Sequence, residues 1–202
     1  MTEKEQKREA KTEKIIQNLL ANGYTKSEKT IGMVVANFVS IFICLPFMLL
    51  DGYLFFIKNG KTWFQLSNTE LLLVMLLLIA AIVIHELIHG LFMGIFAGWK
   101  WDDVEFGFSV KTLTPYCTCQ APISVGQYIV TLLMPTIVLG FIPGIAAMLT
   151  GSSMIFEFSL FMILGGGGDF LITALLLVYK RTGQEMFIID HPTKCGFYAF
   201  EK

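Results

Sequence analysis

The chain has 202 residues, of which 54% are hydrophobic and only 15% are charged, and its mean hydropathy is +0.65. This profile excludes an ordinary soluble domain and predicts one compact membrane bundle with several spans. The formal net charge of -1 comes without any block of basic residues, so no nucleic-acid partner is expected.

The N-terminal segment, residues 1–30, is polar and mixed in charge. Within it, apolar side chains recur at helical spacing at Ile15, Ile16, Leu19 and Leu20. This pattern predicts a short amphipathic helix that ends near Gly23 and lies on the membrane surface or packs on the bundle. A solvated tail is the alternative. The first long apolar stretch comes only after this segment, so no cleavable secretory signal is expected.

Four apolar stretches are long enough to cross a bilayer, which takes about 20 residues. They are residues 31–50, 71–98, 127–150 and 154–179. The first could also continue to Ile57. The loop between the third and fourth stretches is very short, which predicts that these two helices form an antiparallel hairpin. We therefore expect an all-α membrane protein with a transmembrane domain over residues 31–180 and a C-terminal tail over residues 181–202.

Basic residues predict the orientation of these spans. Only two of the 15, Lys58 and Lys61, fall between the first and second spans. Because basic residues stay on the cytoplasmic side, we expect both termini in the cytoplasm, in a multi-pass protein of the cell membrane. The second and fourth spans then run in the same direction.

The second span contains the sequence His85-Glu86-Leu87-Ile88-His89, with uncharged residues on both sides. On a helix His85 and His89 share a face, so both imidazoles can reach one Zn²⁺. Glu86 lies next to them, where its carboxylate can take a proton from a water molecule that the metal activates. Ionisable groups at membrane depth are costly, so this motif is the candidate functional site.

A catalytic zinc site usually has three protein ligands, so one more must come from elsewhere in the chain. Asp169 is the best candidate, because a rise of about 1.5 Å per residue places it in the fourth span at the depth of His85. Four glycines precede it and would allow a close approach to the second span, or a locally unwound stretch. His191 is the main alternative ligand, followed by Asp190 and Glu157. Asp169 could also simply pair with a polar neighbour.

The segment between the second and third spans has the character of strands. Residues 104–113 alternate apolar and other side chains, and Tyr116-Cys117-Thr118-Cys119 follows a proline. We therefore expect a small insertion resembling a β-hairpin. Cys117 and Cys119 could ligate a metal or form a redox pair, but a strand-like pair of small apolar residues is the simpler interpretation. With Cys44 and Cys195 they are too scattered for a disulfide framework.

An HExxH motif in a membrane helix, then a segment with strand character, then a membrane helix with a lone Asp resembles the site-2 protease group of intramembrane zinc peptidases. The resemblance is closest to small bacterial membrane proteins described as "putative zincin peptidases", and it covers residues 71–202. It implies one Zn²⁺ per chain, held by His85, His89 and Asp169, with Glu86 as the general base.

Two elements of the chain depart from that group. The group carries an Asn-Pro-x-Asp-Gly type of sequence around its Asp, whereas Asp169 lies in Gly-Gly-Gly-Asp-Phe. An Ala-Gly-Pro element is represented only by Met134-Pro135.

In the same group an edge strand after the HExxH helix holds the substrate in an extended form. This implies that a membrane protein or peptide binds along Phe106, Phe108, Tyr116, Cys117 and Cys119. A hairpin that merely covers the site is the alternative. The expected function is an intramembrane zinc metallopeptidase. A metal-binding transport or sensor protein without proteolysis, and a pseudo-enzyme or chaperone that needs no metal, remain as other functions.

Overall fold

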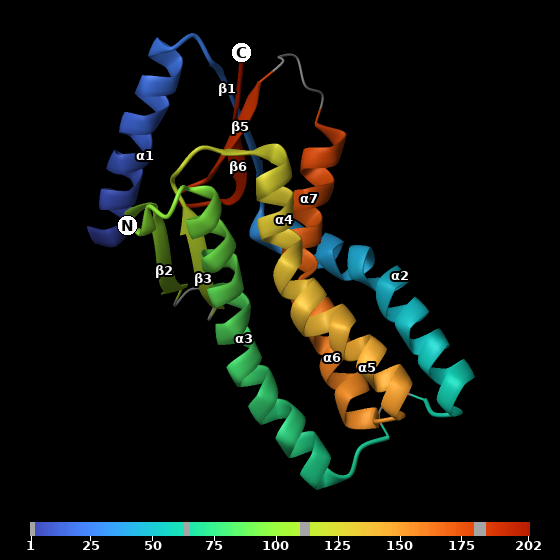
Figure 1. Cartoon of the computed structure of the whole chain (residues 1–202). Helices are drawn as coiled ribbons and strands as arrows, with labels where there is room; N and C mark the ends of the chain where they lie inside the picture. The colour runs from blue at the N-terminus through green and yellow to red at the C-terminus, as the bar shows by residue number, and fades with distance from the viewer. Residues whose placement is uncertain (1–2, 63–64, 110–113, 180–184) are drawn as a thin grey trace.

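The computed structural model describes residues 3–62, 65–109, 114–179 and 185–202. Its long helices extend away from an end at which the β-strands gather, and both chain termini lie at that end (Figure 1). The molecule therefore consists of a helical part and a β-containing end, and the chain passes between them several times.

The helical part contains the predicted spans. Its helices are α2 (Met33–Asn59), α3 (Asn68–Phe96), α4 (Val125–Thr136), the π-helical turn η2 (Ile137–Phe141), α5 (Ile142–Thr150), α6 (Ser153–Gly165) and α7 (Gly167–Val178). Three helices of the described chain are long and apolar enough to cross a membrane: α2, α3 and the run from α4 to α5. The pair α6–α7, bent by 45°, makes a fourth if it is one span. All four predicted stretches are thus helical, and the first ends at Asn59.

Serine caps fix where two of these helices begin. The Ser67 side chain accepts a hydrogen bond from the Glu70 backbone N–H at the start of α3, and the Glu70 side chain accepts one from the Ser67 N–H. Ser124 and Gln127 form the same capping box at the start of α4. Such boxes satisfy backbone donors that a helix start leaves open, so both helices have defined first turns.

The four glycines at 165–168 form the break between α6 and α7. Gly166 and Gly167 have their close neighbours on α4 and α2, whereas Gly165 and Gly168 line the same pocket as His85 of α3. A Cβ at Gly166 would lie 1.8 Å from Thr136 Oγ1, and one at Gly167 would lie 3.1 Å from Cys44 Sγ. The other two glycines meet nothing within 4 Å. The missing side chains at Gly166 and Gly167 therefore allow two tight contacts with α4 and α2 at the bend between α6 and α7.

A four-stranded antiparallel sheet joins three separate parts of the chain, in the order β1-β6-β5-β4. Its strands are β1 (Thr25–Ile31), β4 (Ile123–Ser124), β5 (Met186–Asp190) and β6 (Cys195–Glu201). The prediction of an all-α protein is wrong on this point. Each strand is short, and β1 is a polar edge strand whose partner β6 lies at the far end of the chain.

Helices cover both faces of this sheet. On one face lies α1 (Glu3–Ala21), whose Ile16 packs with Ile189, Tyr198 and Phe200. On the other face, α4 and α7 contribute buried apolar residues, namely Tyr128, Leu132, Ile172 and Leu176. The predicted amphipathic helix is confirmed. It packs on the sheet, so the alternative of a solvated tail is wrong.

The insertion between α3 and α4 is an antiparallel hairpin, as predicted. It follows a short 3₁₀ turn, η1 (Trp101–Asp103), and consists of β2 (Val104–Ser109) and β3 (Thr114–Cys119). The hairpin lies between α1 and α3 (Figure 1). From α1, Lys11 Nζ lies 2.8 Å from Asp103 Oδ1, and the Arg8 guanidinium lies 5.0 Å from the centroid of the Tyr116 ring.

Gly196, in β6, is the position in the sheet at which an added side chain should destabilise the fold most. Its φ is +144°, and a Cβ there would lie 2.1 Å from the Lys29 carbonyl oxygen in β1. We expect Gly196→Ala to lower the melting temperature of the purified protein by about 5 °C or more, since such a backbone angle alone costs about 1–3 kcal/mol. Gly126→Ala is the control, because nothing lies within 4 Å of its Cβ position. An unchanged melting temperature for Gly196→Ala would contradict the β1–β6 register.

Candidate metal centre

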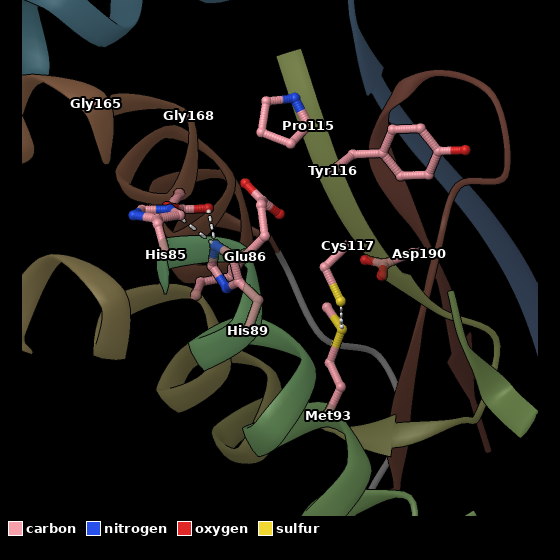
Figure 2. A pocket seen from close by; sticks show the side chains of 12 residues that line it. His85, Glu86, His89, Met93, Pro115, Tyr116, Cys117, Gly165, Gly168 and Asp190 are labelled. Atoms are coloured by element: carbon pink, nitrogen blue, oxygen red, sulfur yellow. Dashed lines mark hydrogen bonds and ion pairs between the residues drawn. The ribbon is translucent and has the colours of Figure 1, made fainter. Parts of the chain in front are cut away.

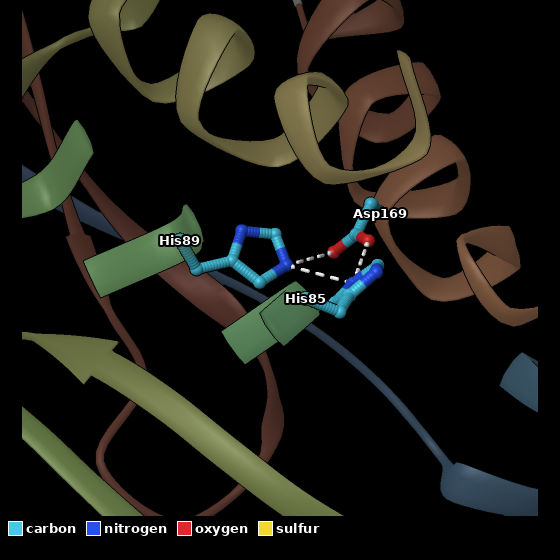
Figure 3. Close-up of side chains that lie close together, drawn as sticks. All are labelled: His85, His89 and Asp169. Atoms are coloured by element: carbon cyan, nitrogen blue, oxygen red, sulfur yellow. Dashed lines mark hydrogen bonds and ion pairs between the residues drawn. The ribbon is translucent and has the colours of Figure 1, made fainter. Parts of the chain in front are cut away.

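Three side chains from two helices meet at one point in the bundle. His85 and His89 lie one helical turn apart on α3 and are buried, and Asp169 lies in the first turn of α7. Figure 3 shows both imidazoles directed at the carboxylate. His85 Nε2 lies 3.2 Å from Asp169 Oδ2, His89 Nε2 lies 3.4 Å from Asp169 Oδ1, and the two Nε2 atoms are 3.1 Å apart.

These separations fit a zinc ion. Zinc–ligand bonds of about 2.0–2.1 Å in a tetrahedron place neighbouring donor atoms about 3.3 Å apart. Among the described residues, these three form the group of His, Cys, Asp or Glu whose ligand atoms all lie within 4.8 Å of one another. Two imidazoles and one carboxylate also resemble the donor sets of catalytic zinc sites, which keep one position open. The residues present therefore fit Zn²⁺.

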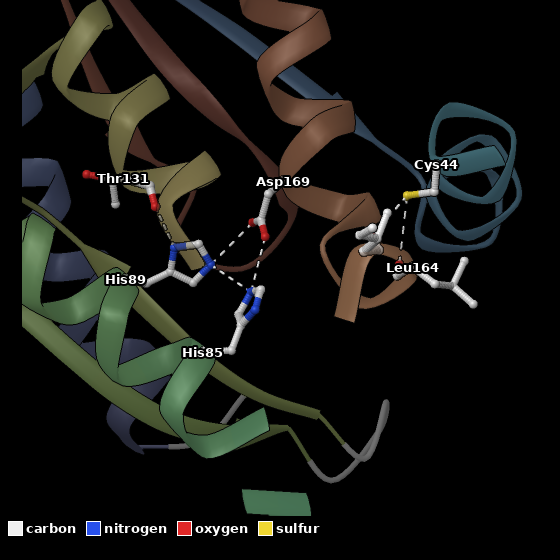
Figure 4. A network of polar contacts seen from close by, with 7 residues as sticks. Cys44, His85, His89, Thr131, Leu164 and Asp169 are labelled. Carbon is white, nitrogen blue, oxygen red and sulfur yellow. Dashed lines mark hydrogen bonds and ion pairs between the residues drawn. The ribbon is translucent and has the colours of Figure 1, made fainter. Parts of the chain in front are cut away.

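A backbone carbonyl orients the second histidine. His89 Nδ1 lies 2.9 Å from the Thr131 carbonyl oxygen in α4, a contact drawn in Figure 4. A carbonyl only accepts, so Nδ1 carries the proton and Nε2 is the nitrogen available to a metal. Histidine ligands are commonly held in this way by a hydrogen bond from their other ring nitrogen.

Glu86 lies in the same pocket but outside the three-residue donor set. The pocket has a volume of about 220 Å³, and Glu86, both histidines and Asp169 all line it. Figure 2 shows the Glu86 side chain between the histidines and the strand that carries Pro115. Its carboxylate also has the Cys117 backbone N–H within hydrogen-bonding reach. Glu86 is therefore placed beside the donor set and not within it.

The hairpin brings some of the predicted substrate-binding residues to this pocket and not others. Tyr116 and Cys117 line it, whereas Phe106, Phe108 and Cys119 do not. The Phe106 ring packs on α3 at a glycine, Phe108 is 57% exposed, and Cys119 is buried. Phe106 pairs with Cys117, so both side chains lie on the same face of the hairpin, towards α3. The Phe106 ring packs at Gly90, outside the pocket.

Cys117 and Cys119 are free thiols. Burial raises the pKa of Cys119 to about 12 and raises that of Cys117 further. Metal ligation and redox chemistry both need the thiolate, which burial disfavours at both positions. Cys117 Sγ instead lies 3.7 Å from Met93 Sδ. This arrangement favours the simpler interpretation of a strand-like pair of small apolar residues.

His191 lies away from the metal centre. Its Nδ1 accepts hydrogen bonds from the backbone N–H groups of Thr193 and Lys194, and its Nε2 lies 3.1 Å from the Tyr198 hydroxyl oxygen. Burial lowers the pKa of His191. His191 therefore stabilises a turn in the C-terminal tail. Glu157, another candidate ligand, does not line the metal-centre pocket either.

Asp190 makes contacts beside the metal centre that the sequence did not predict. It lines the pocket, accepts a hydrogen bond from the Cys119 N–H at 2.7 Å and accepts another from the Tyr128 hydroxyl. Burial raises its pKa, and these hydrogen bonds oppose that shift. Asp190 thus connects the tail to the edge of β3. The sequence suggested it only as a rival ligand, because its two partners lie far away along the chain.

A second, apolar cavity of about 420 Å³ adjoins the metal centre. It shares His85, Glu86, Pro115 and Gly165 with the first pocket, and adds the apolar residues Leu78, Ile82, Phe161 and Met162. The polar centre is therefore continuous with an apolar groove formed by α3 and α6.

Comparison with known proteins gives one family match, which covers the middle of the chain. A family model described as "putative zincin peptidase" matches residues 78–183, a little over half of the chain. The matched segment includes the two histidines, Glu86, the hairpin and Asp169. Comparisons with curated proteins and with solved structures gave no match.

Proposed function

The chain belongs to the "putative zincin peptidase" family, and we propose that it is an intramembrane zinc metallopeptidase of the site-2 protease type. The observation that carries this proposal is the position of Glu86. It is an ionisable carboxylate that lines the same pocket as the His85, His89 and Asp169 donor set without belonging to it. A site that only stores or carries a metal has no need for such a group.

The residues divide the chemistry between binding and proton transfer. A bound Zn²⁺ supplies Lewis-acid chemistry, which polarises a peptide carbonyl and makes water a nucleophile near neutral pH. His85 and His89 would hold the ion through Nε2, and Asp169 through its carboxylate, whose charge offsets part of that of the ion. Glu86 takes a proton from the attacking water and delivers it to the amine nitrogen as the C–N bond breaks.

The neighbouring surfaces suit an extended, apolar substrate. Strand β3 pairs only with β2 among the described strands, so its other edge faces the pocket without a partner strand. An added strand would expose its peptide carbonyls there, which a helix would hide. The apolar cavity between α3 and α6 suits the side chains of a membrane segment. The proposed substrates are therefore membrane proteins or membrane-bound peptides.

The proposed location is the cell membrane, with both termini in the cytoplasm. Strand β1, near the N-terminus, pairs with β6, near the C-terminus. This pairing supports the proposal that both ends of the chain lie on the same side of the membrane, as four spans require. Only 11% of the most apolar window of α2 is buried, so lipid would cover the rest. We expect a single cysteine at position 202, in a variant without the four native cysteines, to resist an impermeant maleimide added to intact cells. Labelling from outside would overturn the orientation.

Zinc content and cleavage together test the proposed function. We expect about one Zn²⁺ per purified wild-type chain and almost none in His85→Ala, because two donors hold the ion poorly. In cells that express the wild type, we expect new N-termini within membrane proteins, absent with His85→Ala. Protein that holds no zinc and binds none in titration would contradict the proposal. Zinc binding without any new N-termini would instead favour the transport or sensor function.

A further inference from the structure

The Thr131 carbonyl lacks its usual helical partner. In an α-helix the carbonyl of residue i accepts a hydrogen bond from the N–H of residue i+4. For Thr131 that residue is Pro135, which lies inside α4 and has no N–H. Thr131 is fully buried, at 0% exposure, so water cannot replace the missing donor. A buried carbonyl without a donor is unfavourable, and another group must supply one.

His89 supplies that donor. Its Nδ1 lies 2.9 Å from the Thr131 oxygen, and α3 packs against α4 at this point (Figure 4). The Thr131 hydroxyl does not compete, because it donates to the Gln127 carbonyl at 3.0 Å. The bond fixes the proton on Nδ1 and directs the bare Nε2 towards His85 and Asp169.

We propose that Pro135 is a positioning residue of the metal centre, which acts by leaving the Thr131 carbonyl free for His89. Proline in a helix interior is strongly unfavourable, so its presence in this helix calls for a compensating role. This role rests on one part of the proposed function, namely that His89 binds the metal through Nε2. It does not depend on whether a peptide is cleaved.

The variant Pro135→Ala tests this role by restoring the N–H. The new donor would share the carbonyl and draw it back along the helix axis, which weakens its bond to His89. Loss of an outer partner of a metal ligand typically weakens metal affinity by about 10–100-fold, and a shared carbonyl should fall near the lower end. We therefore expect the Kd for Zn²⁺, measured by competition with a chromophoric chelator, to rise about tenfold.

Pro46→Ala is the matched control. Pro46 also lies inside a helix, α2, and its i−4 residue is Phe42, which is 70% exposed. The control makes the same substitution at a proline inside a helix. We expect it to leave the Kd for Zn²⁺ within twofold of the wild type. An equal loss in both variants would mean that Pro135 acts only on helix shape.

Nitrogen NMR of the histidine side chains in the metal-free protein, recorded at a pH high enough for the His89 imidazole to be neutral, gives a second, independent readout. We expect His89 in the wild type to be the Nδ1–H tautomer, and Pro135→Ala to add signal from the Nε2–H tautomer. A wild-type His89 with a bare Nδ1 would overturn the proposal, even if Pro135→Ala failed to fold. An unchanged Kd and tautomer in a folded Pro135→Ala would do the same. If the wild type bound no zinc, the proposed function would fail while the tautomer comparison still decided this inference.

Discussion

Glu86→Gln is expected to abolish peptide cleavage and to leave zinc binding unchanged. Glutamine has nearly the same size and can still accept the hydrogen bond from the Cys117 N–H. It cannot take up a proton from water, and general acid–base catalysis contributes about 10²–10⁴-fold. We therefore expect turnover of an identified substrate to fall by at least about 10²-fold, with one Zn²⁺ per chain still present.

Glu70→Gln is the matched control for this change. It makes the same substitution on the same helix, at the start of α3, where glutamine also serves in a capping box. We expect wild-type turnover and zinc content from Glu70→Gln. If Glu86→Gln kept full turnover, the general-base role would be wrong. If it lost its zinc, Glu86 would have to be a ligand or a structural support of the site.

The part of this site that could be predicted is the part with local or fixed spacing. His85 and His89 share a face because helical periodicity is a property of a few adjacent residues. Asp169 could be placed because membrane thickness and helical rise set depth along two parallel spans. The structure brings these three residues together with donor atoms 3.1–3.4 Å apart.

The four-stranded sheet could not be predicted, because its signal is not local. Strand β1 reads Thr-Lys-Ser-Glu-Lys-Thr-Ile, a polar edge strand that buries almost nothing by itself. Strand β4 has only two residues. Each becomes a strand through pairing with a segment far away in the chain, and no short window of sequence contains both partners. The buried core of the C-terminal tail depends on the same pairing.

The contacts of the hairpin were only partly predictable. Alternation in the sequence indicated strands, but it could not say which face would turn towards α3. That choice depends on Gly90, where a Cβ would lie 2.1 Å from the Phe106 ring. With the ring packed there, Tyr116 and Cys117 line the pocket, and Phe106 serves to hold the hairpin on α3.

Asp169→Ala is expected to weaken zinc binding more than His191→Ala. Asp169 contacts both imidazoles, so its loss would remove one of three donors and the only negative charge among them. We expect the Kd for Zn²⁺ to rise by more than about 100-fold, since even outer partners of a ligand contribute about 10–100-fold. His191→Ala should leave the Kd unchanged. It should instead lower the free energy of unfolding by about 1–3 kcal/mol, because two backbone N–H groups lose their acceptor.

Asp169→Asn separates coordination from charge at the same position. The amide oxygen can still reach the ion, but it does not offset the positive charge in a buried setting. We therefore expect its Kd for Zn²⁺ to fall between those of the wild type and Asp169→Ala. Full zinc occupancy in Asp169→Ala, together with loss of zinc in His191→Ala, would mean that the third ligand comes from the tail. The metal centre would then have to form in an arrangement in which β5 and β6 move towards α3, because His191 now lies outside the pocket that contains His85 and His89.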